Sequence, residues 1–157
     1  MNYNIPLFDL SYNNLKIKDY ILSVVERHIE TSTFILGPDV KLFEEKFSEL
    51  INCNYTIGVN SGTDALIIAL KSLDIGPGDE VITVSNTAIP TVSAIKCCGA
   101  KARFVDVGSD YLIDANKIEK CITKNSKAII PVHLYGQSCD MEKICKIAKK
   151  HKLKIVE

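Results

Sequence analysis

The 157-residue sequence has no tryptophan, no net charge and no long apolar stretch. Nineteen basic residues balance nineteen acidic ones, so no overall field attracts a polyanion and nucleic-acid binding is disfavoured. The longest unbroken apolar run, residues 65–70, is far shorter than the roughly 18 residues of a membrane span. The N-terminus also lacks the basic and then apolar pattern of a secretory signal. We therefore expect a soluble cytoplasmic protein that binds neither nucleic acid nor membrane.

The spacing of a metal site is missing as well, although the chain has six cysteines. None of them forms a C-x-x-C pair, and no histidine stands at zinc-site spacing. Free cysteine behaves as a small apolar residue, so we expect buried thiols in a reducing compartment and no metal. The six residues are Cys53, Cys97, Cys98, Cys121, Cys139 and Cys145.

What the sequence does contain is a regular alternation of helical and extended patterns. Apolar residues recur at three- and four-residue steps in the expected helices, which cover residues 14–30, 38–51, 63–73, 90–98, 114–122 and 140–151. Short β-branched runs predict strands at residues 55–59, 80–84, 103–107, 128–133 and 153–156. Pro131 is awkward within a ladder and indicates an interruption there. The alternation predicts an α/β fold with a mostly parallel sheet and helices on both faces.

Residues 58–70 are the most informative stretch, because a β-branched strand passes through a small polar turn into an apolar helix. The first turn of a helix has main-chain N–H groups without partners at the positive end of the helix dipole, and these bind anions. Gly62 would let the backbone approach a phosphate, and Thr63 would add a hydroxyl. The alternative is a capped helix start without a ligand, with Ser61 or Thr63 as cap and Asp64 complementing the dipole.

Ligands of parallel sheets gather at the carboxyl ends of the strands. The segments expected at these ends are residues 60–63, 85–89 and 133–137. In the last segment, His133, Tyr135 and Gln137 bring polar and aromatic side chains to a backbone that Gly136 makes flexible, which suggests a ligand site. The alternative is a loop in which His133 only satisfies a neighbouring carbonyl group.

Six motifs follow one another along essentially the whole chain, at residues 5–10, 34–38 with 43–44, 60–66, 76–82, 99–106 and 131–137. In this order they resemble the DegT/DnrJ/EryC1/StrS family of pyridoxal-phosphate-dependent sugar aminotransferases. The resemblance implies the large domain of a type I aminotransferase, in truncated form. Residues 1–157 would be its N-terminal part, with an N-terminal helix and substrate loop in 1–37 and a βαβ core in 38–157.

The resemblance also implies a function, a cofactor and site residues. The full-length protein would be a homodimer that uses pyridoxal 5′-phosphate to move an amino group from an amino acid, with glutamate the expected donor, to a nucleotide-linked keto-deoxysugar. Segment 85–89 would pass over the pyridine ring, and many relatives have a bulky side chain at the position of Ala88. The implied cofactor-binding residues are Ser61, Gly62, Thr63, Thr87, Ala88 and Gln137, and the implied substrate contacts are Phe34, Ile35, Gly37 and Tyr135.

The resemblance places no catalytic residue within the chain. In the family, an aspartate that keeps the pyridine nitrogen protonated directly follows a strand similar to residues 155–157, and the lysine that carries the cofactor comes later. We therefore expect both beyond Glu157 and an inactive N-terminal fragment. Two alternatives stay open: a sugar dehydratase relative that uses the same cofactor with histidine in place of lysine, and a non-catalytic phosphate-binding α/β module.

Overall fold

The computed structural model describes residues 6 and 8–157, so residues 5 and 7 of the first motif lie outside the described residues. The chain divides into two compact units between Gly58 and Val59, and each is described by itself. Within the described ranges, no helix is long and apolar enough to cross a membrane. The expected division into residues 1–37 and 38–157 stays a prediction.

The first unit contains two helices, α1 (Ser11–Thr31) and α2 (Pro38–Leu50), both predicted by their apolar periodicity. Proline suits the first position of α2, where its missing N–H removes no hydrogen bond. Asp39 in the first turn of α2 connects the helices. Its Oδ2 lies 2.5 Å from Arg27 Nη2 and 2.9 Å from His28 Nε2, so His28 has a structural contact in α1.

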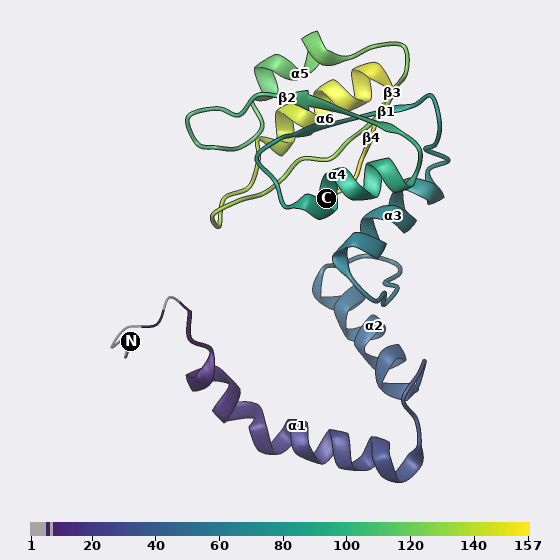
Figure 1. Ribbon diagram of the computed structural model, residues 1–157, viewed down its shortest axis with the longest axis vertical. Helices are drawn as coiled ribbons and strands as arrows, with labels where there is room; N and C mark the ends of the chain where they lie inside the picture. The colour runs from purple at the N-terminus through teal and green to yellow at the C-terminus, as the bar shows by residue number, and fades with distance from the viewer. Residues whose placement is uncertain (1–5, 7) are drawn as a thin grey trace. The chain divides into compact units, whose positions relative to one another are not determined.

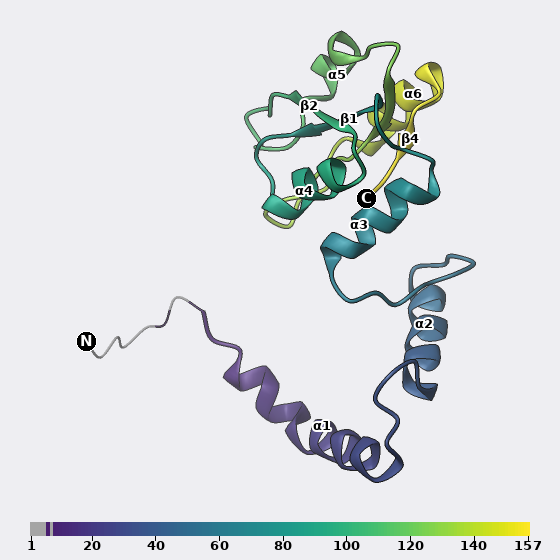
Figure 2. The ribbon, with the colours of Figure 1, turned by 45° about the vertical axis from the view of Figure 1, so that its right-hand side comes forward.

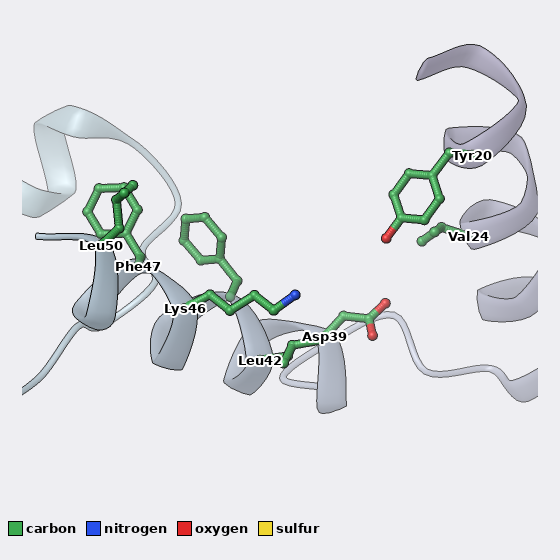
Figure 3. A pocket seen from close by; sticks show the side chains of 8 residues that line it. Tyr20, Val24, Asp39, Leu42, Lys46, Phe47 and Leu50 are labelled. Atoms are coloured by element: carbon green, nitrogen blue, oxygen red, sulfur yellow. The ribbon is translucent and has the colours of Figure 1, made fainter. Parts of the chain in front are cut away.

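An apolar hollow of about 360 Å³ lies between α1 and α2. Figure 3 shows Tyr20 and Val24 of α1 directed toward the side chains of α2. Neither helix contains a buried residue, and the aromatic rings of Phe43 and Phe47 are also partly exposed. Both helices therefore have the apolar face that the sequence predicts, but most of each face is exposed.

The second unit is built around a four-stranded parallel sheet with the strand order β2-β1-β3-β4. Figures 1 and 2 show helices on both of its faces. This arrangement confirms the predicted α/β class. The elements in chain order are α3 (Gly62–Ser72), β1 (Glu80–Val84), α4 (Ile89–Cys97), β2 (Lys101–Val105), α5 (Ala115–Cys121), β3 (Ser126–Ile129), α6 (Met141–His151) and β4 (Lys154–Ile155).

Successive side chains of β1 enter two separate cores, because neighbouring residues of a strand point to opposite faces. Val81 packs with residues of α3 and α4, including Leu70 and Ile95. Ile82 packs on the other face with residues of α5 and α6, including Ile144. Burial on both faces explains why β1 is mostly apolar and is buried without a break from Val81 to Val84.

One expected strand, residues 55–59, is absent. The segment has no strand assignment, and Tyr55 and Ile57 are 87% and 75% exposed. A strand needs a neighbour to accept and donate its ladder hydrogen bonds, and the segment forms no such ladder. The segment does contain β-branched residues, but the prediction that it forms a strand was wrong.

Pro131 ends β3 early, as its missing N–H predicts. The last ladder bond on this side runs from Ile130 N to Ile82 O at 2.8 Å. The carbonyl of Ile130 then accepts a hydrogen bond from the hydroxyl of Thr83, a completely buried side chain of β1, at 3.0 Å. The strand therefore ends within the core with its last carbonyl satisfied, and the chain is free to leave the sheet toward residues 133–137.

Acid pH should weaken the start of α5. The main-chain N–H of Asn116 donates to the cap residue Asp114 at 3.0 Å, and this bond lowers the pKa of the Asp114 carboxyl. A carboxyl with a lower pKa in the folded state stabilises the fold above its unfolded pKa, and this stabilisation is lost as the pH falls through the folded pKa. Asp114→Asn keeps a cap but does not titrate. The melting temperature of this variant, measured at several pH values, should therefore approach that of the unsubstituted chain as the pH falls. A difference in melting temperature between the variant and the unsubstituted chain that is the same at all pH values would contradict this expectation.

Candidate functional site

The turn before α3 is a capped helix start. The Ser61 hydroxyl accepts a hydrogen bond from the Asp64 N–H at 3.1 Å and donates one to the Asp64 carboxylate at 2.8 Å. Ser61 is therefore the cap, as one of the two sequence interpretations predicted. Its hydroxyl therefore has two partners within the turn and holds the turn in place.

The cap leaves two main-chain donors of α3 open. In the part of the chain that the structure describes, the N–H groups of Gly62 and Thr63 have no hydrogen-bond acceptor. A Cβ added at Gly62 would meet no atom within 4 Å, and Gly62 is not one of the glycines with positive φ. Neither packing nor backbone conformation requires glycine here. Two open donors beside a residue without a side chain are what a phosphate group needs for close approach.

The turn at residues 85–88 follows β1 directly. The Thr87 hydroxyl lies 2.8 Å from the hydroxyl of the buried Thr91, and the Thr87 N–H donates to Ser85 O at 3.0 Å. Ala88 precedes α4 without a side-chain cap and is exposed. It presents only a methyl group, in a turn held by Thr87 and the first residues of α4.

The loop after β3 is anchored by His133. Its Nδ1 accepts a hydrogen bond from the Cys139 N–H at 3.1 Å, so in the neutral ring the proton is on Nε2, which lies 2.9 Å from Glu157 Oε2. The alternative that His133 satisfies a carbonyl group was wrong, because its partners are an N–H group and a carboxylate. The pair connects the loop to the end of β4, and Gln137 within the loop is exposed.

The cysteines do not supply a nucleophile to this loop. Cys139 is buried, its Sγ lies 3.3 Å from Val132 O, and burial raises the pKa of its thiol. The expectation of buried thiols was wrong for Cys53, Cys97 and Cys145, which are exposed; Cys145 points away from the core side of α6. Across residues 6 and 8–157, no group of three or more His, Cys, Asp or Glu side chains is arranged to hold a metal ion.

Sequence reasoning missed Tyr111, although Asn86 lies in the segment 85–89 that it expected at the strand ends. Asn86 Nδ2 donates to Tyr111 O at 3.2 Å, and the rings of Tyr111 and Tyr135 lie edge to face with centroids 6.1 Å apart. Tyr111 lies in the loop between β2 and α5, which the sequence did not connect with the site. No sequence signal marks it, because the contact depends on the sheet order placing β2 and β3 on either side of β1.

Three of the predicted substrate contacts lie in the first unit. Phe34 and Ile35 are 68% and 85% exposed, and Gly37 is the extended residue before α2. Their approach to the strand ends stays a prediction. The fourth, Tyr135, is exposed and lies in the loop that His133 anchors.

The second unit is thus a parallel α/β domain whose helix start and strand-end loops suit a phosphorylated ligand. The sequence profile of the DegT/DnrJ/EryC1/StrS aminotransferase family matches residues 15–157. The chain belongs to this family of pyridoxal-phosphate-dependent aminotransferases, as its six motifs predicted.

Individual relatives agree with this assignment. A dTDP-3-amino-3,6-dideoxy-α-D-galactopyranose transaminase of Aneurinibacillus thermoaerophilus is 46% identical over 98% of this chain and 42% of its own length. The crystal structure of DesV from S. venezuelae has a TM-score of 0.95 at 36% identity, over 99% of this chain and 42% of that one. The structure of NtdA from Bacillus subtilis with bound cofactor PMP has a TM-score of 0.92 at 36% identity, over 99% of this chain and 36% of that one. The chain therefore spans about two fifths of the length of these relatives.

Proposed function

We propose that this chain is the cofactor-binding part of an aminotransferase that transfers an amino group from an amino acid to a nucleotide-linked keto-deoxysugar in the cytoplasm, with glutamate as donor. The observation that carries the proposal is the pair of open N–H donors at Gly62 and Thr63, beside a glycine that the fold does not require. The activities of the relatives support the substrate class, because the relatives include transaminases of dTDP- and UDP-linked sugars.

The residues present fit pyridoxal phosphate. Gly62 and Thr63 would hold its phosphate through main-chain N–H groups and the Thr63 hydroxyl, while Ser61 and Asp64 keep the turn in shape. Thr87, Ala88 and the segment around Gln137 would line the ring. When bound, the cofactor supplies an electron sink that makes proton removal beside the amino nitrogen easier. This chain's own contribution would be to bind the phosphate and to line the ring.

We also propose that the full-length protein is a homodimer. The support lies in α1, where apolar side chains remain exposed. Leu15, Ile17, Leu22, Val25 and Ile29 are each between 49% and 68% exposed. Exposed apolar surface of this kind marks regions that are covered by another protein surface. Sedimentation of the full-length protein would test the proposal, and a monomer at micromolar concentration would contradict it.

The phosphate site is tested by comparing pyridoxamine phosphate with pyridoxamine. Pyridoxamine phosphate has no aldehyde, so it forms no imines with surface lysines. We expect it to shift the amide NMR signals of residues 61–64, and we expect pyridoxamine to leave these signals unchanged, since the phosphate provides the contact. Equal shifts by both compounds, or no shift at residues 61–64, would argue against the assigned site.

No single lysine of this chain should carry pyridoxal phosphate. Segments 60–64, 85–88 and 133–137 contain no lysine. The two lysines in the first turns of α5 and α6 are engaged elsewhere, Lys117 with Asp106 and Asp114, and Lys143 with Asn116. After borohydride reduction, peptide mass mapping should show only scattered, substoichiometric labelling, and turnover of glutamate and keto sugar should be absent. Complete labelling of one lysine together with turnover would contradict this prediction.

A further inference from the structure

Tyr111 belongs to none of the segments that the sequence assigned to the site, yet it contacts two of them. Its main-chain carbonyl accepts the hydrogen bond from Asn86 in the turn after β1, and its ring meets that of Tyr135 in the loop after β3 at an interplanar angle of 83°. Figure 1 shows the loops after β2 and β3 leaving the same side of the sheet. Three loops that follow three neighbouring strands therefore come together at Tyr111.

The backbone at both tyrosines is unfavourable for their side chains. Tyr111 and Tyr135 have φ values of +65° and +55°, a region that residues other than glycine, asparagine and aspartate rarely adopt. Leu134 and Gln137 exchange both main-chain hydrogen bonds around Tyr135 and Gly136, which forms a two-residue turn with positive φ at both central positions. Such a turn favours Asn-Gly.

Burial does not explain why tyrosine occupies these positions. The two residues are 61% and 71% exposed, so each ring buries little surface in the core. Strained backbone conformations are concentrated at functional sites, and here no burial of the side chain compensates for the strain. The contact between the two rings, at the edge of the proposed cofactor site, is what these positions have in common.

We infer that Tyr111 is a positioning residue of this site, which fixes the ring of Tyr135 by edge-to-face contact and the 85–88 turn through Asn86. The inference rests on the proposed function, because it concerns the same cofactor site. Tyr111 need not touch the cofactor. It holds in place two loops that carry Thr87, Ala88, Tyr135 and Gln137, which come from different strands and share no hydrogen bond of their own in the described residues.

The test compares three variants of the whole chain with pyridoxamine phosphate as the probe. Tyr111→Phe keeps the ring, Tyr111→Leu removes it, and both keep the carbonyl that Asn86 contacts. Tyr135→Asn removes the second ring and supplies a residue that the turn favours. Binding is followed through the amide signals of residues 61–64, Thr87 and Gln137, and melting temperature is the measure of folding.

Tyr111→Leu should weaken binding by about 2- to 12-fold, the factor that corresponds to the coupling of an aromatic pair. Tyr111→Phe should bind like the unsubstituted chain, because it keeps both the ring and the main-chain carbonyl. Tyr135→Asn should also weaken binding while its melting temperature stays the same or rises, because the turn is relieved. Combining Tyr111→Leu with Tyr135→Asn should weaken binding no further than either change alone.

Two outcomes would overturn the inference, and they are distinguishable. If the unsubstituted chain responds at residues 61–64 and Tyr111→Leu responds equally strongly, with unchanged signals at Thr87 and Gln137, then the cofactor site is real and Tyr111 does not position it. If the unsubstituted chain shows no response at residues 61–64, the proposed cofactor site fails and the inference fails with it.

Discussion

Replacing Ile144 by alanine should lower the free energy of unfolding of the second unit by about 2 to 5 kcal/mol, the cost of a cavity in a closely packed core. The side chain of Ile144 in α6 is completely buried. It packs in the core on one face of the sheet together with Ile82, Ile118 and Ile129, so truncation removes contacts to β1, α5 and β3 at once. Denaturant unfolding followed by circular dichroism would measure the change.

Two substitutions in the same helix serve as controls. Ile144→Val removes one methylene and should cost only about 0.5 to 1.5 kcal/mol. Cys145→Ala changes the next residue, which is exposed, and should alter stability by no more than about 0.5 kcal/mol. If Ile144→Ala and Cys145→Ala had equal effects, the core between the sheet and α6 would not be packed as described.

Thr63→Val should weaken binding of pyridoxamine phosphate by about 1 to 3 kcal/mol, the range for a hydrogen bond to a charged group. The substitution preserves the shape of the side chain and removes one hydroxyl. Gly62→Ala tests the main chain at the same place. The fold has room for its Cβ, so stability should be kept while the added methyl group stands between the phosphate and the open N–H groups.

Ser72→Ala is the matched control, because it removes a hydroxyl from the opposite end of α3, where the group donates to Ala69 O at 2.8 Å. It should leave binding unchanged. Isothermal titration of the four proteins at one ionic strength would compare them. Unchanged affinity in both Thr63→Val and Gly62→Ala would show that the start of α3 is not the phosphate site.

The order of helices and strands in the second unit could be predicted from periodicity, because helical patterns alternate regularly with short extended segments along this part of the chain. Residues 55–59 show the limit of this reasoning. Three of these five residues are β-branched, but a pattern describes one segment, and a strand also depends on its neighbour. The same limit applies to Cys145, whose apolar character does not reveal which side of α6 it occupies.

The candidate site was predictable where one local segment contains it. Gly62 and Thr63 could be found because a helix start is a local feature of the sequence. Tyr111 could not, because its role depends on the sheet order and on two backbone conformations that tyrosine rarely adopts. His133 was found as a residue of interest, but its partners, the Cys139 N–H and the Glu157 carboxylate, become visible only in the folded chain.

The contact between Thr83 and the carbonyl of Ile130 has a consequence for how such a protein diverges. Pro131 and Thr83 decide where β3 stops, and both belong to the core. The loop at residues 133–137 begins only after this point, so insertions or replacements within it need not shift the register of the sheet. A lineage can therefore explore new loop sequences, and with them new ligand preferences, while the scaffold that carries the loop stays the same.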